Sequence, residues 1–128
     1  MLILQGSCPP KSSNLMFVYV NLKRSHWVLL RINRLEKSGI VFDSSSRPTS
    51  HGQCQHLFDY LVKYLFGDKK KWKFETSNLV KQQGDHECGV ICMLHLKKNL
   101  FDPDLIIDTS NITQERKKLA LQILNEKL

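Results

Sequence analysis

Cys88 is the residue whose type and position point most clearly to chemistry. It begins an almost uninterrupted apolar stretch, 88–96, that is too long for most strands and is predicted to be a buried helix. A thiol in the first turn of a helix lies at the positive end of the helix dipole, which favours the nucleophilic thiolate. Cys88 therefore has two interpretations, a nucleophile or a small buried residue that opens a core helix.

A nucleophilic cysteine needs a base and a group that orients the base. His26 opens a predicted strand, 26–32, and Asp43 ends another, 40–43. Strand ends are common positions for catalytic groups, and adjacent antiparallel strands could bring these two side chains together. The register stays open, because the turn signal at 38–39 is off-centre between the strands.

The other four histidines are weaker candidates for the base. His95 lies within the apolar helix and is expected to be a core or flanking residue, whereas His86 lies in the polar loop before Cys88. His51 and His56 flank Cys54 in a polar segment, and we expect both to be solvated.

The elements that must position these residues form an α+β pattern. We expect a loose leader over 1–14 and a single domain over 15–128. Short apolar runs rich in aromatic and β-branched residues predict three strands at 15–22, 26–32 and 40–43, which would form an antiparallel meander. Apolar residues at helical spacing predict a helix over 58–66 that is stopped by Gly67, and alternating apolar and polar residues predict an edge strand at 72–76. Two further helices are predicted at 88–96 and about 112–124.

Composition limits the class of protein. The chain has 128 residues, 41% of them hydrophobic, which suits one compact domain and is too short for two. It has no apolar run of about 20 residues and no secretory signal, so we expect a soluble intracellular protein whose four cysteines are reduced. The net charge of +7 favours an acidic partner, either nucleic acid or an acidic protein.

Four motifs occur in a fixed order: His26-Trp27, Asp43, Gln82 six residues before the cysteine, and Cys88-Gly89. In this order and at these separations they resemble the ubiquitin-like-protein-specific cysteine proteases, the Ulp/SENP group. The resemblance covers about 15–124.

The resemblance implies a papain-like fold, in which a small, mostly antiparallel sheet packs against a central helix that starts at the nucleophile. It implies that Cys88 is the nucleophile, that His26 is the general base and later the acid, and that Asp43 orients the imidazole. Gln82 would donate to the oxyanion together with the backbone N–H of Cys88, and Trp27 would wall the tunnel for a Gly-Gly tail. No metal or cofactor is implied.

The implied activity is cleavage after the C-terminal Gly-Gly of SUMO or a related modifier, in the nucleus or cytoplasm, by a protein that we expect to be a monomer. Domains of this family usually carry a further N-terminal part, so 15–128 would match the C-terminal part of the usual domain. The alternative within this family is a modifier-binding relic without activity.

Two other functions are considered. Lysines around Trp72, at 69–73, could bind nucleic acid, although a solvated loop whose tryptophan packs back into the fold is the preferred interpretation. A zinc site could be formed by four candidate ligands, His86, Cys88, Cys92 and His95. Their helical spacing is compatible with ligands on one helix face, but the paired CxxC motifs of typical zinc sites are absent from the sequence. A buried core position is preferred for Cys92.

Overall fold

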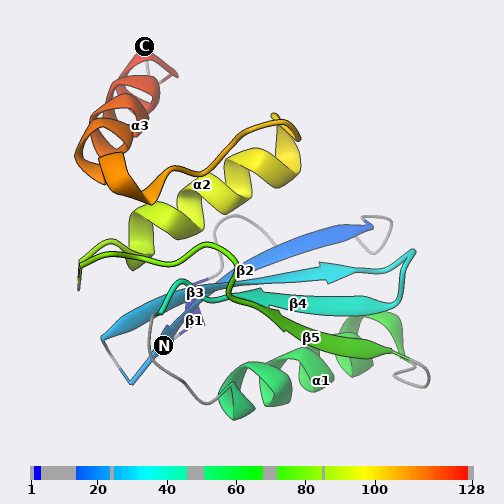
Figure 1. Cartoon of the computed structure of the whole chain (residues 1–128). Coiled ribbons are helices and arrows are strands. Elements are labelled where there is room, and N and C mark those ends of the chain that lie inside the picture. The colour runs from blue at the N-terminus through cyan, green and yellow to red at the C-terminus, as the bar shows by residue number, and fades with distance from the viewer. Residues whose placement is uncertain are drawn as a thin grey trace.

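The computed structural model describes residues 2–3, 14–23, 25–45, 51–67, 72–84 and 86–126 (Figure 1). Its elements, in chain order, are β1 (Leu2–Ile3), β2 (Leu15–Leu22), β3 (His26–Asn33), β4 (Ser38–Phe42), α1 (Gly52–Phe66), β5 (Lys73–Ser77), α2 (Cys88–Leu100), the 3-10 turn η1 (Thr109–Asn111) and α3 (Ile112–Glu126). Apart from β1 and residue 14, the predicted leader lies outside the described residues.

The strands form one sheet in the order β1-β2-β3-β4-β5. Neighbours from β1 to β4 pair antiparallel, which confirms the predicted meander, and β5 pairs parallel to β4 at the edge of the sheet. The parallel pairing is possible because α1 provides the long crossover connection.

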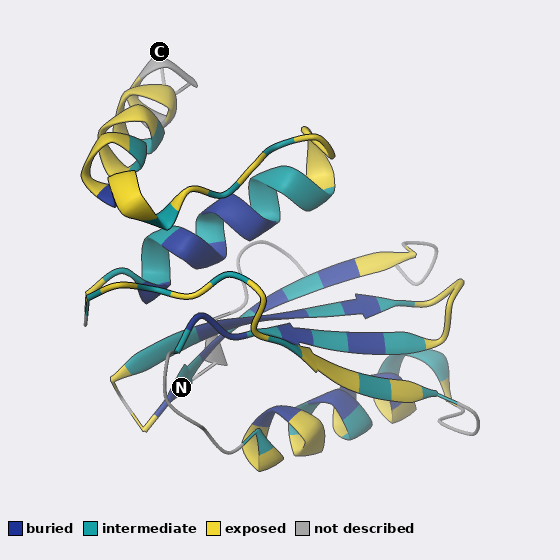
Figure 2. Ribbon diagram, in the orientation of Figure 1, coloured by how far each residue is buried: buried dark blue, intermediate teal, exposed yellow. Residues whose placement is uncertain are grey.

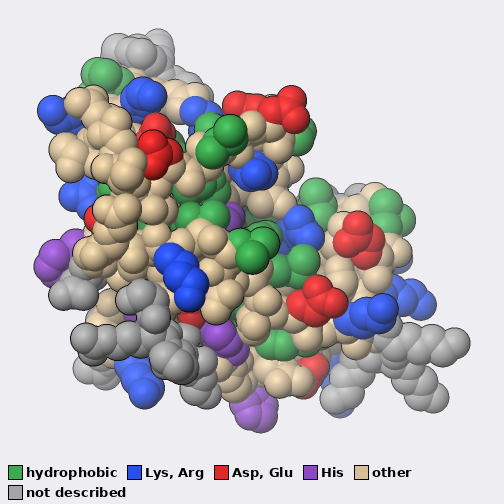
Figure 3. All heavy atoms as spheres, viewed as in Figure 1, with side chains coloured by type: hydrophobic (Ala, Val, Ile, Leu, Met, Phe, Trp, Pro, Cys, Tyr) green, Lys and Arg blue, Asp and Glu red, His purple; other side chains and the backbone are tan. Residues whose placement is uncertain are grey.

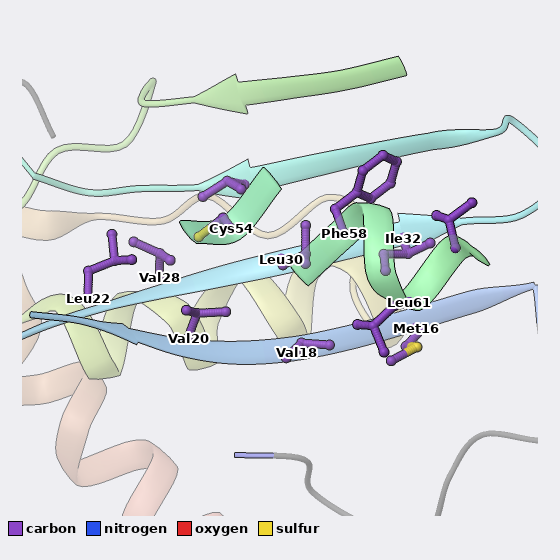
Figure 4. Packing of buried hydrophobic residues seen from close by; sticks show 12 residues of the cluster. Met16, Val18, Val20, Leu22, Val28, Leu30, Ile32, Cys54, Phe58 and Leu61 are labelled. Atoms are coloured by element: carbon purple, nitrogen blue, oxygen red, sulfur yellow. The ribbon is translucent and has the colours of Figure 1, made fainter. Parts of the chain in front are cut away.

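Helices cover both faces of the sheet, with α1 on one face and α2 on the other, and α3 lies beyond α2 (Figures 1 and 2). Alternate strand residues turn towards α1, as their buried positions show. The resulting core is apolar and contains Cys54 and Phe58 of α1 (Figure 4); its buried members on the strands are Met16, Val18, Val20, Leu22, Val28, Leu30, Ile32 and Val41. The structure therefore has the expected α+β architecture, in three layers.

Two glycines are required by local geometry. A Cβ on Gly39 would lie 2.4 Å from the Phe58 ring, so glycine lets β4 approach α1 closely. Gly67 has φ +72° and its N–H donates to the carbonyl of Lys63, which makes it the predicted helix stop. The other end of α1 lies six residues before the predicted start, because its first turn is mostly polar.

Candidate active site

The start of β3 and the end of β4 bring the predicted base and its orienting group together. Leu29 pairs with Phe42, so β3 extends beyond the end of β4 and His26 lies beside the residues that follow β4. His26 Nε2 lies 2.5 Å from Asp43 Oδ1. The antiparallel register that the sequence left open therefore joins this pair directly.

Asp43 is buried, at 3% exposed, and both of its carboxylate oxygens have partners. The Ser45 N–H donates to Oδ1 at 2.9 Å, and His51 Nε2 lies 2.7 Å from Oδ2. An ionised carboxylate only accepts hydrogen bonds, so with Asp43 ionised both imidazoles carry a proton on Nε2. This tautomer leaves Nδ1 of His26 as the nitrogen that can take a proton.

Cys88 is the first residue of α2, and α2 packs on β3. Its Sγ accepts the backbone N–H of Trp27 at 3.4 Å, so the thiol lies beside the residue that follows His26. The hydrogen bonds found among the described residues do not join the thiol to the His26 ring directly.

Cys92 lies one turn further along α2 and is a different kind of thiol. It is 2% exposed and donates to the backbone carbonyl of Trp27 at 3.5 Å. Burial, followed by the charges of Cys88 and Asp43, raises the pKa of Cys92. The structure therefore places it in the core, as preferred from the sequence.

Gln82 lies next to the Asp43 segment. Its backbone N–H donates to the carbonyl of Ser44 at 2.8 Å, and its side-chain oxygen accepts from the Ser44 hydroxyl at 2.9 Å. Its amide nitrogen donates to the carbonyl of Gly84 at 2.8 Å, which leaves the second N–H of that amide as the one that could face an oxyanion. The structure thus ties Gln82 to the site through Ser44 and shows no hydrogen bond from it to Cys88 in the described chain.

Trp27 lines a cavity of about 610 Å³ next to the candidate nucleophile. The cavity lies between the first strands and the first turns of α2; its other lining residues are Tyr19, Ser25, His86, Gly89, Val90 and Met93. A Cβ on Gly89 would meet no atom within 4 Å, so the cavity is open at the residue after Cys88. Burial raises the pKa of Tyr19 to about 12, which keeps its hydroxyl neutral.

His51 is the site residue that sequence reasoning missed. Its side chain is 20% exposed and contacts Asp43, so the expectation that it is solvated is wrong. No sequence signal marks it, because a polar residue before a helix is ordinary on an exposed surface. His56, four residues into α1, is exposed as expected.

The remaining candidate residues, His95 and Trp72, pack against other aromatic rings of the fold. His95 is buried and its ring stacks on Phe42 at 4.6 Å, as expected for a core histidine. Trp72 packs on Phe66 with ring centroids 5.5 Å apart, as in the preferred interpretation of the lysine-rich segment, whereas 68–71 lie outside the described residues. Lys and Arg are scattered among acidic residues on the face seen in Figure 3.

The search for metal and membrane sites covered only the described residues. Within those ranges, no group of three or more His, Cys, Asp or Glu side chains is placed to hold a metal ion. None of the helices placed there has the length and apolar character needed to cross a membrane.

Comparisons with known proteins place the chain in a family. Residues 11–127 match the model of the Ulp1 protease family, C-terminal catalytic domain. No curated protein matches.

Solved structures share the fold. They include the SUMO protease Ulp1 with its catalytic cysteine oxidised to a sulfonic acid, at 21% identity and a TM-score of 0.74 over 89% of this chain and 54% of that one. The C-terminal Ulp1 protease domain in complex with Smt3, the yeast orthologue of SUMO, matches at 21% identity and a TM-score of 0.74, over 89% of this chain and 53% of that one. The Ulp1-like SUMO protease catalytic domain of Chaetomium thermophilum matches at 16% identity and a TM-score of 0.61, over 84% of this chain and 45% of that one. The chain thus spans about half the length of these structures.

Proposed function

Because the chain belongs to the Ulp1 protease family, we propose that it is a cysteine-type peptidase or isopeptidase that cleaves after the C-terminal Gly-Gly of SUMO or a related modifier. The observation that carries the proposal is the His26–Asp43 hydrogen bond of 2.5 Å, which lies beside the thiol at the start of α2. That thiol accepts a hydrogen bond from the backbone of Trp27, the residue after His26. This arrangement supplies a nucleophile, a base and an orienting carboxylate.

In the proposed reaction, His26 Nδ1 takes the thiol proton and the Cys88 sulfur attacks the carbonyl carbon of the terminal glycine. The C–N bond breaks as the imidazolium returns the proton to the leaving amine, which leaves a thioester on Cys88. Water, deprotonated by His26, then hydrolyses the thioester. Asp43 stays ionised throughout and stabilises the imidazolium.

Negative charge develops on the carbonyl oxygen during the attack. The first backbone N–H groups of α2 have no acceptor within the helix, so that of Cys88 can donate to this oxygen. Gln82 is the proposed second donor, through the amide N–H that does not bind Gly84.

The cavity beside Trp27 and Gly89 is the proposed position of the glycine tail. Glycines lack side chains, so a glycine tail can lie with its backbone close to both the Trp27 indole and the start of α2. The proposed partner is a modifier with a Gly-Gly terminus, and neither a metal nor a cofactor takes part. We further propose that 15–128 is one domain, equivalent to the C-terminal part of the usual family domain, which acts as a monomer in the nucleus or cytoplasm.

The test is labelling with SUMO that carries a C-terminal electrophile, analysed by intact mass. A single adduct on the wild type, absent from Cys88→Ser, supports the proposal. Wild-type protein that forms no adduct and hydrolyses no fluorogenic modifier would contradict it, and SUMO binding by titration without turnover would select the modifier-binding alternative.

A further inference from the structure

Two histidines, and not one, hold the buried carboxylate of the candidate triad. His26 lies on Oδ1 and His51 on Oδ2, at 2.5 and 2.7 Å. The Asp43 side chain is only 4% exposed, whereas the two imidazoles are 15% and 20% exposed. Asp43 therefore lies behind both rings, screened from water.

A carboxylate can rotate about its Cβ–Cγ bond, and this rotation changes the direction in which Oδ1 points. Hydrogen bonds on both oxygens constrain the plane of the group more than bonds on one oxygen do. His26 and the Ser45 N–H bind Oδ1, and the bond from His51 to Oδ2 adds to the restraint on that plane. It also offsets part of the cost of burying the charge, because hydrogen bonds to a buried ion are worth more than those in water.

The backbone of His51 is itself held in place. Its carbonyl accepts the N–H of Gln55 at 2.9 Å, as the first hydrogen bond of α1. Two residues of that helix, Cys54 and Phe58, are buried against the sheet. Burial, and secondarily the negative charge of Asp43, raises the pKa of Cys54 to about 11.

We propose that His51 is a positioning residue, which holds the Asp43 carboxylate so that Oδ1 faces His26 and thereby couples the start of α1 to the nucleophile on the opposite face of the sheet. The inference concerns the same site as the proposed function and rests on it where turnover is concerned. The orientation of the triad itself does not require a modifier.

The test compares His51→Phe, which keeps an aromatic ring and removes the donor, with His51→Gln, which keeps an N–H donor at similar reach. His56→Gln is the matched control, because His56 lies in α1, the helix that His51 precedes, and is exposed. Circular dichroism and thermal unfolding establish that each variant is folded.

The first readout needs no modifier: the rate of iodoacetamide alkylation at Cys88, mapped by peptide mass, from pH 5 to 9. A thiolate held by an imidazolium reacts below pH 7, where an ordinary thiol, with a pKa of about 8.5, is nearly inert. We expect His51→Phe to lose between about tenfold and a hundredfold of the rate below pH 7 while reacting normally at pH 9, because misplacing the orienting group by about 1 Å has effects of this size. His51→Gln should retain most of the wild-type alkylation rate below pH 7.

The second readout is hydrolysis of a fluorogenic SUMO substrate. The expected result for His51→Phe is a fall in kcat by a similar factor with KM unchanged, because His51 lies behind Asp43 and does not line the cavity. His56→Gln should match the wild type in both readouts.

The outcomes separate the two proposals. Folded His51→Phe with a wild-type alkylation profile overturns the role of His51, whatever the turnover, and so does a Gln variant as impaired as the Phe variant. If the wild type hydrolyses no modifier but its alkylation profile depends on His51 as described, the proposed function fails and the positioning role stands. If His51→Phe does not fold, His51→Gln is compared with His51→Leu by the same profile.

Discussion

Asp43 is the residue on which the proposed chemistry of the site depends. Its carboxylate receives two imidazoles and a backbone N–H while remaining buried. With Asp43 ionised, each of its oxygens acts as an acceptor, so each of the two rings carries a proton on Nε2. In that protonation state Nδ1 is the basic nitrogen of His26.

Replacing Asp43 with asparagine should severely reduce the activity. An amide has one acceptor oxygen, so the side chain of the Asp43→Asn variant would direct its NH₂ at one of the two ring N–H groups and force a tautomer change. We expect kcat/KM for modifier hydrolysis to fall on the order of 10²- to 10⁴-fold. The exposed Asp104→Asn is the control, with no change expected. Activity of Asp43→Asn within about threefold of wild type would contradict this account.

His95 should make stability depend on pH. Burial, and secondarily Lys98, lowers the pKa of His95 to about 4 from 6.5. Below pH 6.5 the unfolded chain therefore takes up a proton that the folded chain resists until about pH 4, so stability present above pH 6.5 is lost as pH falls through this window. The loss should be on the order of 3 kcal/mol.

The measurement is the free energy of unfolding by urea at pH 7, 6, 5 and 4. His95→Leu should show a shallower decline than the wild type, and the exposed His56→Gln should follow the wild type. Parallel curves for His95→Leu and the wild type would show that His95 is not the group responsible.

At the scale of elements, most of the fold was predicted from the pattern of apolar and polar residues and from the residues that break helices and strands. β2 was predicted at its observed bounds, and the predicted meander and the helix that begins at Cys88 are confirmed. The pairing of His26 with Asp43 needed the register of β3 and β4, which an off-centre turn does not encode. The role of His51 was not predictable, because it depends on where α1 begins, and polar first turns carry no periodic signal.

Gly39 should be sensitive to a single methyl group. Alanine there would place its Cβ 2.4 Å from the Phe58 ring, so β4 or α1 must move. We expect Gly39→Ala to lower the free energy of unfolding by about 1–3 kcal/mol, measured by urea denaturation. Gly89→Ala is the matched control: it lies in α2, its Cβ meets nothing within 4 Å, and its stability should be unchanged or up to about 1 kcal/mol higher. Equal effects at the two sites would refute the close approach.

Arg116 connects α3 to the segment before the nucleophile. Its Nη2 donates to the carbonyl of His86 at 3.0 Å. We expect Arg116→Gln to speed hydrogen exchange of the backbone over 86–88 severalfold with little effect on global stability, since the contact is exposed. Lys117→Gln, on the exposed side of the same helix, should leave this exchange unchanged; the same change in both variants would show that the contact does not hold the segment.

At the scale of the whole molecule, the three layers explain why the site forms where it does. The sheet separates α1 from α2, yet both helices begin near the ends of β3 and β4 (Figure 1). The first residue of α2 supplies the thiol, and the residue before α1 supplies the second histidine on the carboxylate. A site assembled from both faces of a sheet requires the complete packing, so its chemistry should be lost together with the fold.

The measurement that tests the central claim most directly is the intact mass of the protein after reaction with SUMO bearing a C-terminal electrophile. The account predicts one adduct, mapped to Cys88, that His26→Ala slows strongly and Cys88→Ser abolishes. No adduct on the folded wild type, or an adduct that persists in Cys88→Ser, would contradict it.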